Sequence, residues 1–132
     1  MVVLVFGLLV AIVAPAIGRY TEDLNLKGAV DQMANAVRLT RDRAMATRIQ
    51  RTVHFEAGVS GTDYHAVDAS GAPQGGWKLP RGITYAWLPG TIDSVTVTPD
   101  GRCNVSGLVI LRAVHGAQDT VSVLTSGLVL TQ

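Results

Sequence analysis

The sequence opens on an unbroken apolar stretch, MVVLVFGLLVAIVAPAIG at residues 1–18, which no other part of the chain resembles. None of its side chains is charged or polar. As an α-helix these residues extend about 27 Å, close to the roughly 30 Å of bilayer hydrocarbon. We therefore predict a membrane-anchoring helix over 1–18. Pro15 deprives the Ala11 carbonyl of its usual helical partner, so we expect a bend in that region.

Two other interpretations of residues 1–18 stay open. A buried core helix is one of them, although such helices in small domains usually keep a polar face. A cleaved signal peptide is the other, because Ala14-Pro15-Ala16 is similar to a cleavage site of small residues. It would make the chain a secreted β-domain binding protein whose mature form begins near Ile17. A signal peptide normally begins with a positively charged segment, which this stretch lacks.

Length and charge limit the classes of protein that fit. The 132 residues suffice for one modest domain besides the apolar stretch. The net charge is only +1, whereas dedicated nucleic-acid binders are strongly basic, so we expect no nucleic-acid partner. Cys103 is the single cysteine, and the domain must therefore fold without an internal disulfide.

A second helix is predicted after a polar junction at residues 19–25. Apolar residues at intervals of four, three, four and seven fall in one stripe of a 3.6-residue helix: Leu26, Val30, Met33, Val37 and Ala44. This amphipathic helix can continue the apolar stretch without a break. We expect a transmembrane or filament-core helix over 1–18, an amphipathic helix packed on the globular domain over 19–51, and an antiparallel β domain over 52–132.

The end of the second helix is basic. Five arginines and Asp42 give residues 38–51 a charge of +4 (5 − 1), which leaves −3 (1 − 4) for the rest of the chain. Arg41, Arg48 and Arg51 are candidates for contact with an acidic partner, phosphates or lipid head groups. The alternative is that these cations only complement the dipole at the helix C-terminus.

From residue 52 the pattern changes to short β-rich runs separated by turn residues. We predict strands over 52–57, 64–68, 83–87, 94–98, 107–114, 120–124 and 128–131. The gaps are too short for crossover helices, so the sheets should be antiparallel and the fold class α+β. Residues 69–80 hold three glycines and two prolines, and we expect an exposed loop there.

Few residues offer catalytic chemistry. His54 with Glu56, and Asp63 with His65, could supply nitrogen and oxygen ligands to a metal, as a membrane-anchored enzyme would need. The alternative is polar decoration of exposed strands. The sequence has no HExxH, CxxC or GxSxG pattern and no phosphate-binding loop. We therefore predict no enzyme, no cofactor, no metal and no small-molecule substrate.

Several motifs resemble one known family. The start Met1-Val-Val-Leu-Val-Phe-Gly-Leu-Leu9, with a proline later in the helix, resembles the N-terminus of type IV pilins and type II secretion pseudopilins. Four later motifs are similar to those of the H-type minor pseudopilins and their pilus relatives: Arg41-Asp-Arg-Ala-Met-Ala46 followed by Thr52-Val-His-Phe55, Leu79-Pro-Arg-Gly-Ile83, Thr98-Pro-Asp-Gly101, and Leu124-Thr-Ser-Gly-Leu128.

Two departures qualify the resemblance. The family begins with a basic leader, a glycine at the cleavage point and a Phe-Thr-Leu-x-Glu start, none of which is present, so we expect six or seven further residues upstream. DNA-binding relatives carry a Gly-Arg-x-Arg tail, whereas the matching positions here read Gly127-Leu-Val-Leu130. The second departure disfavours a role in DNA uptake.

The resemblance implies a minor pseudopilin of a type II secretion system, or alternatively a minor type IV pilin for pilus biogenesis or DNA uptake. It implies a single-pass, methylated subunit in the bacterial inner membrane with its globular domain in the periplasm, within a pseudopilus or pilus. Its partners would be other pilins or pseudopilins, contacted through the N-terminal helix. The packing residues would include Val2, Val5, Leu9, Ile12 and Pro15.

Overall fold

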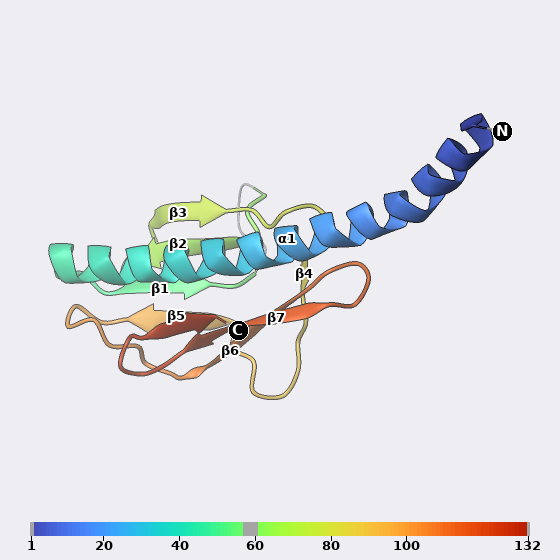
Figure 1. Cartoon of the computed structure of the whole chain (residues 1–132). Helices are drawn as coiled ribbons and strands as arrows, with labels where there is room; N and C mark the ends of the chain where they lie inside the picture. Colours follow the sequence, from blue (N-terminus) through green and yellow to red (C-terminus); the bar gives the residue numbers. More distant parts are fainter. Residues whose placement is uncertain (1, 57–60, 132) are drawn as a thin grey trace.

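A single long α-helix joins the apolar stretch to the globular part of the chain. The structure is a computed structural model that describes residues 2–56 and 61–131, without the side chains of residues 2, 10 and 12–19. Helix α1 runs from Val2 to Thr47, so the two predicted helices are continuous. It ends where Arg48 adopts a left-handed φ of 54°. Figure 1 shows the N-terminal third turning away from the axis of the rest.

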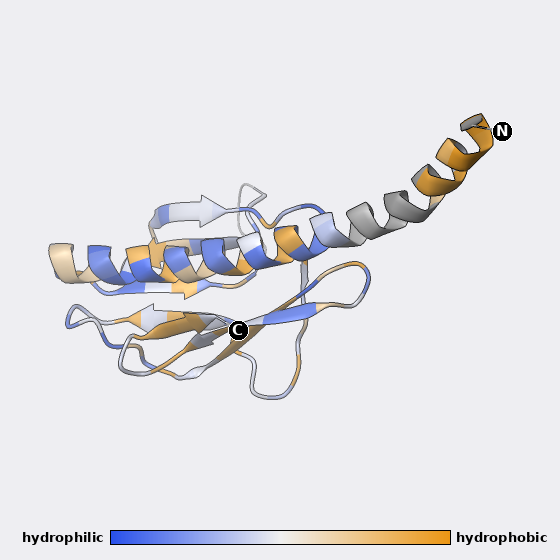
Figure 2. Ribbon diagram, in the orientation of Figure 1, coloured by the Kyte–Doolittle hydropathy of each residue, from blue (hydrophilic) through white to orange (hydrophobic). Residues whose placement is uncertain are grey.

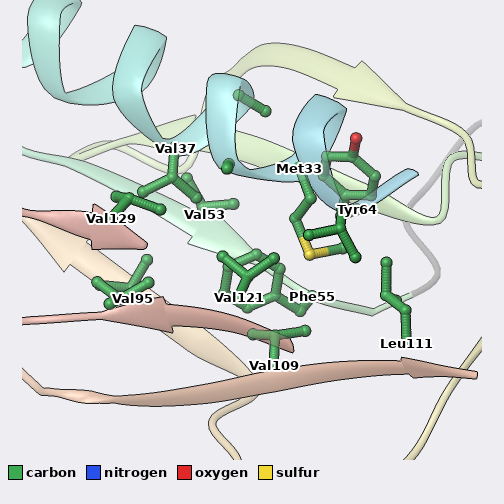
Figure 3. Close-up of a cluster of buried hydrophobic side chains, with 14 of the residues drawn as sticks. Met33, Val37, Val53, Phe55, Tyr64, Val95, Val109, Leu111, Val121 and Val129 are labelled. Carbon is green, nitrogen blue, oxygen red and sulfur yellow. The ribbon is translucent and has the colours of Figure 1, made fainter. Parts of the chain in front are cut away.

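The second half of α1 packs on the sheets through the predicted stripe. Each residue of that stripe is buried: Leu26, Val30, Met33, Val37 and Ala44. Figure 3 shows Met33 and Val37 among the buried side chains of strands, including Val53, Val121 and Tyr64. Figure 2 shows hydrophobic and hydrophilic residues alternating along this half of the helix. Burial of one apolar face against strands therefore holds this half in place.

The first sheet is antiparallel, with the strand order β3-β2-β1-β5. Its strands are β1 (Arg51–His54), β2 (Tyr64–Asp68), β3 (Pro73–Trp77) and β5 (Ser94–Val97). Burial alternates along β1 and β5, as expected when one face of a sheet meets the core.

The second sheet is also antiparallel and has the order β4-β6-β7-β8. Its strands are β4 (Thr84–Tyr85), β6 (Gly107–Arg112), β7 (Gln118–Val123) and β8 (Val129–Thr131). Helix α1 contacts strands of both sheets, and Figure 1 shows it lying along them. The predicted α+β class with antiparallel sheets is confirmed.

The prediction of a loop over 69–80 was wrong, because β3 lies within it. Pro73 is the first residue of this edge strand, where a missing N–H is tolerated. Trp77 stacks on Tyr64 of β2, with ring centroids 5.4 Å apart. Gln74 accepts a hydrogen bond from Arg51 at 2.8 Å. Long-range contacts thus hold a strand whose glycines and proline gave no β signal.

Candidate functional site

Six large apolar side chains near the start of α1 face outward. They are 53–84% exposed: Val3, Leu4, Val5, Phe6, Leu8 and Leu9. Figure 1 shows this end of the helix projecting beyond the sheets, and Figure 2 shows its apolar character. So large a contiguous apolar surface marks a site of contact with protein or lipid. We call these residues the apolar tip.

Two of the predicted packing residues, Val5 and Leu9, belong to the apolar tip. The side chains of Val2, Ile12 and Pro15 lie outside the described residues. Within the described part of the chain, no helix is both long and apolar enough for a membrane span. The packing role of these five residues stays a prediction.

A histidine ties the helix to the second sheet just before the packed half begins. His115 lies in the turn between β6 and β7, where the Ala113 N–H donates to the Ala117 carbonyl at 2.8 Å. Its Nε2 is 3.0 Å from an Asp23 carboxylate oxygen, and its Nδ1 contacts the Glu22 carboxylate. Sequence reasoning assigned His115 only to a turn and missed this contact.

Three helix arginines bind backbone carbonyls of the sheets and turns. Arg38 donates to the Val129 carbonyl of β8 at 2.8 Å, and Arg43 donates to the Gln74 carbonyl of β3 at 3.3 Å. Arg41 Nε donates to the Gly101 carbonyl at 2.9 Å. Both β8 and β3 are edge strands, whose outward carbonyls lack a neighbouring strand. These arginines therefore supply donors that the sheets do not.

The other two arginines of the cluster differ in exposure. Arg51 is only 7% exposed, and its Nη1 binds Gln74. Arg48 is exposed at the end of α1. The structure thus gives Arg41 and Arg51 intramolecular contacts and leaves Arg48 facing solvent. Contact of Arg41, Arg48 or Arg51 with an acidic partner stays a prediction.

The histidines and acids considered for a metal are only partly brought together. His54 and His65 are cross-strand partners whose rings stack at 5.1 Å, and Glu56 lies 3.9 Å from His54 Nδ1. Asp63 is engaged elsewhere, since its carboxylate accepts a 2.7 Å hydrogen bond from the Leu79 N–H. Among the described residues, no three His, Cys, Asp or Glu side chains converge as metal ligands do.

The single thiol lies in the interior. Cys103 is 6% exposed and forms an isolated bridge with Val97 of β5. Burial raises the pKa of the Cys103 thiol, against the opposing effect of the Arg41 charge. A thiol that stays protonated is a poor nucleophile and metal ligand, so this residue acts as a small apolar side chain.

The arrangement of α1 on two antiparallel sheets, with its apolar start projecting, defines a type IV pilin-like fold. Two crystal forms of the type IV minor pilin FimU of Pseudomonas aeruginosa are similar to the chain. The first has a TM-score of 0.62 and 16% identity over 86% of this chain and 92% of FimU. The second has a TM-score of 0.60 and 14% identity over 81% and 92%.

At these identities the likeness is one of fold, and it confirms the expected pilin-like class. The sequence matches no protein-family model and no curated protein.

Proposed function

We propose that the chain is a structural subunit of a pilin-like filament, a minor pseudopilin of a type II secretion system. The carrying observation is the apolar tip, six large exposed side chains on a helix whose other half buries one apolar face against the sheets. A helix in water does not retain such a surface without a covering partner. The similarity in fold to a minor pilin supports sister helices as that partner.

The proposed function rests on the apolar tip, whose surface can be covered either by lipid or by packed helices. Lipid tails and packed helices are equally apolar, so transfer of the helix from one to the other leaves no apolar surface in water. The helix would hold the subunit in the inner membrane first and pack in the filament afterwards. The β domain would then face the periplasm and contact neighbouring subunits.

A minor pilin of a type IV pilus is the second candidate, and the FimU likeness supports it equally. The four later motifs resemble those of the H-type pseudopilins and of their pilus relatives, so they fit both candidates. Three of these motifs meet at the Gly101 carbonyl, which belongs to the turn motif Thr98–Gly101. Arg41 of the helix motif donates to this carbonyl. Gly127 of the strand-start motif lies against it.

The test is a deletion of the gene in the bacterium that encodes the chain, followed by complementation. Loss of type II secretion with normal surface pili supports the pseudopilin, and the converse result supports the minor pilin. Complementation with Phe6→Asp should fail at normal protein level, because a carboxylate in a packed apolar interface is costly. Leu88→Asp, at an exposed residue of the β domain, is the matched control and should complement.

Full complementation by Phe6→Asp would overturn the filament role of the apolar tip. A deletion that impairs neither secretion nor pili would overturn both candidates.

A further inference from the structure

The contact of His115 with Glu22 and Asp23 lies where helix α1 leaves the sheets. Among the described side chains of α1, Leu26 is the first that is buried against the sheets, one turn after Glu22 and Asp23. The β6–β7 turn therefore contacts the helix at the point where the helix leaves the domain. The residues joined are 92 and 93 positions apart in sequence. This contact can fix the direction of the projecting helix. Its effect does not depend on whether the filament serves secretion or a pilus.

Two hydrogen bonds from one imidazole to two ionised carboxylates need both ring nitrogens to carry a proton. Both ring nitrogens of His115 face carboxylate oxygens, from Glu22 at Nδ1 and from Asp23 at Nε2. An ionised carboxylate only accepts hydrogen bonds, and a neutral imidazole has a single N–H. Only the doubly protonated ring can donate to both carboxylates at once. Loss of one proton removes a donor and places a lone pair against an anion.

Other charged groups lie on the surrounding elements. On α1 these are Lys27, one turn beyond Asp23, and Arg19, whose side chain lies outside the described residues. On the hairpin these are Arg112, the cross-strand partner of Gln118, and Asp119, whose carboxylate accepts from the Thr120 N–H at 2.9 Å. Arg81 is a further cation on a neighbouring segment, since it precedes Gly82, which lies beside Val114. Glu22 and Asp23 are thus the anions that face the ring from α1.

We infer that His115, Glu22 and Asp23 form a charge-dependent latch that sets the direction of the N-terminal helix. With the imidazolium present, the β6–β7 turn holds α1 at Glu22 and Asp23. With a neutral ring this contact weakens, and the helix pivots at Leu26, where the buried contacts of its described side chains with the sheets begin. The latch goes beyond the proposed filament role, because it concerns the angle of the helix and not the partner that covers it.

The expected movement is large enough to measure. Fifteen residues separate Leu26 from Ala11, which is about 22 Å of helix, so a pivot of about 15° at Leu26 displaces Ala11 by about 6 Å. Spin labels at Ala11 and Ser106, both exposed, report this displacement. The measurement uses the full chain in detergent micelles with Cys103→Ala, so that only the two introduced cysteines carry labels.

Distances are measured at about pH 5.5 and about pH 8.5, on either side of the range in which imidazole side chains titrate. The latch predicts a narrow distribution at the lower pH and, at the higher pH, a mean shift of about 6 Å or a width increased about twofold. His115→Gln should give the broad or shifted distribution at both pH values. His115→Arg, a permanent cation with several donors, should give the narrow one at both.

Two controls keep the result specific. His54→Gln, in the stacked pair with His65, should behave as the wild type. Glu22→Gln with Asp23→Asn should behave as His115→Gln, and this variant replaces it if circular dichroism shows His115→Gln to be unfolded. A wild-type distribution that does not change with pH overturns the latch. So does a folded His115→Gln, or the folded double variant, with the wild-type distribution at the lower pH.

Discussion

Arg41 and Gly101 lie 60 residues apart in sequence and are joined by a 2.9 Å hydrogen bond from the guanidinium Nε to the backbone carbonyl. The β7–β8 turn reaches the same carbonyl, since a Cβ added at Gly127 would lie 2.1 Å from it. Helix α1 and two turns of different sheets therefore meet at one carbonyl. Stability should depend on this point more than on the neighbouring surface.

Arg41→Ala should lower the free energy of unfolding by about 1.5–3 kcal/mol, the range for hydrogen bonds that involve a charged group. Urea denaturation of the full chain in detergent measures it. Arg48→Ala is the control, because this exposed arginine should matter by no more than about 0.5 kcal/mol. Equal effects of the two substitutions would show that the Gly101 contact contributes nothing.

Gly127→Ala should be far more damaging than Gly116→Ala, although both glycines have similar φ values of 87° and 94°. A left-handed conformation alone costs an alanine about 1–2 kcal/mol. A Cβ at Gly127 also meets the Gly101 carbonyl, which adds about 1–3 kcal/mol of overpacking. Gly116 has open space at this position. Thermal unfolding of both variants would contradict this account if the two melting temperatures coincide.

Arg48→Gly should stabilise the chain by about 0.5–1 kcal/mol. Arg48 follows the end of α1 with φ at 54°, a conformation that glycine adopts without the strain of a Cβ. The gain should appear as a higher midpoint in urea denaturation with an unchanged slope. Arg48→Ala keeps the Cβ and should show no such gain, so equal midpoints for Arg48→Gly and Arg48→Ala would contradict the cap.

Acid should remove a contribution that Asp68 makes to stability. The Ser70 hydroxyl first, and then the amides of Ala72 and Ser70 and the charge of Arg51, hold the pKa of this carboxyl below its ordinary value, although desolvation opposes them. Because the folded-state pKa is lowered, the contribution is present above the ordinary value of about 3.9 and is lost as pH falls through the folded value. Denaturation midpoints measured against pH should therefore fall less steeply below about pH 4 in Asp68→Asn.

Ser70→Ala should weaken the same acid dependence, since it removes the first of these donors. Parallel pH profiles for Asp68→Asn and the wild type would show that the Asp68 turn is not responsible.

Cys103 should react slowly with alkylating reagents in the folded chain. Its burial both hides the sulfur and raises the pKa of the thiol, so little thiolate is present near neutrality. Iodoacetamide at about pH 8 should modify it at least about tenfold more slowly than the urea-unfolded chain. An exposed cysteine introduced by Ser106→Cys with Cys103→Ala is the control and should react at the unfolded rate. Rapid modification of Cys103 in the native chain would contradict its burial.

The sequence predicts those parts of the fold that depend on local periodicity. The stripe from Leu26 to Ala44 repeats with the helical period, and strands such as β2 and β5 carry β-branched residues between turn residues. Strand β3 has neither signal. It exists because Trp77 stacks on Tyr64 and because Arg43 and Arg51 bind Gln74, contacts that only the folded chain brings together.

The apolar tip and the latch differ in the same respect: the sequence predicts the first and not the second. An apolar tip is visible in the sequence, since hydropathy is a local property. The latch is not, because His115 has no sequence neighbour that marks it, and its acids lie 92 and 93 residues away. The adjacent carboxylates of Glu22 and Asp23 on the helix could have indicated a site for a cationic side chain. Nothing in the chain indicated which of three histidines would meet them.

The packing of α1 on both sheets determines how the domain bears load. A pull along the axis of the packed segment from Leu26 to Ala44, about 27 Å long, loads its contacts with the sheets in shear. In shear the contacts with both sheets have to yield together, whereas a sideways force would peel them apart turn by turn. The chain is therefore built to resist tension along its own helix.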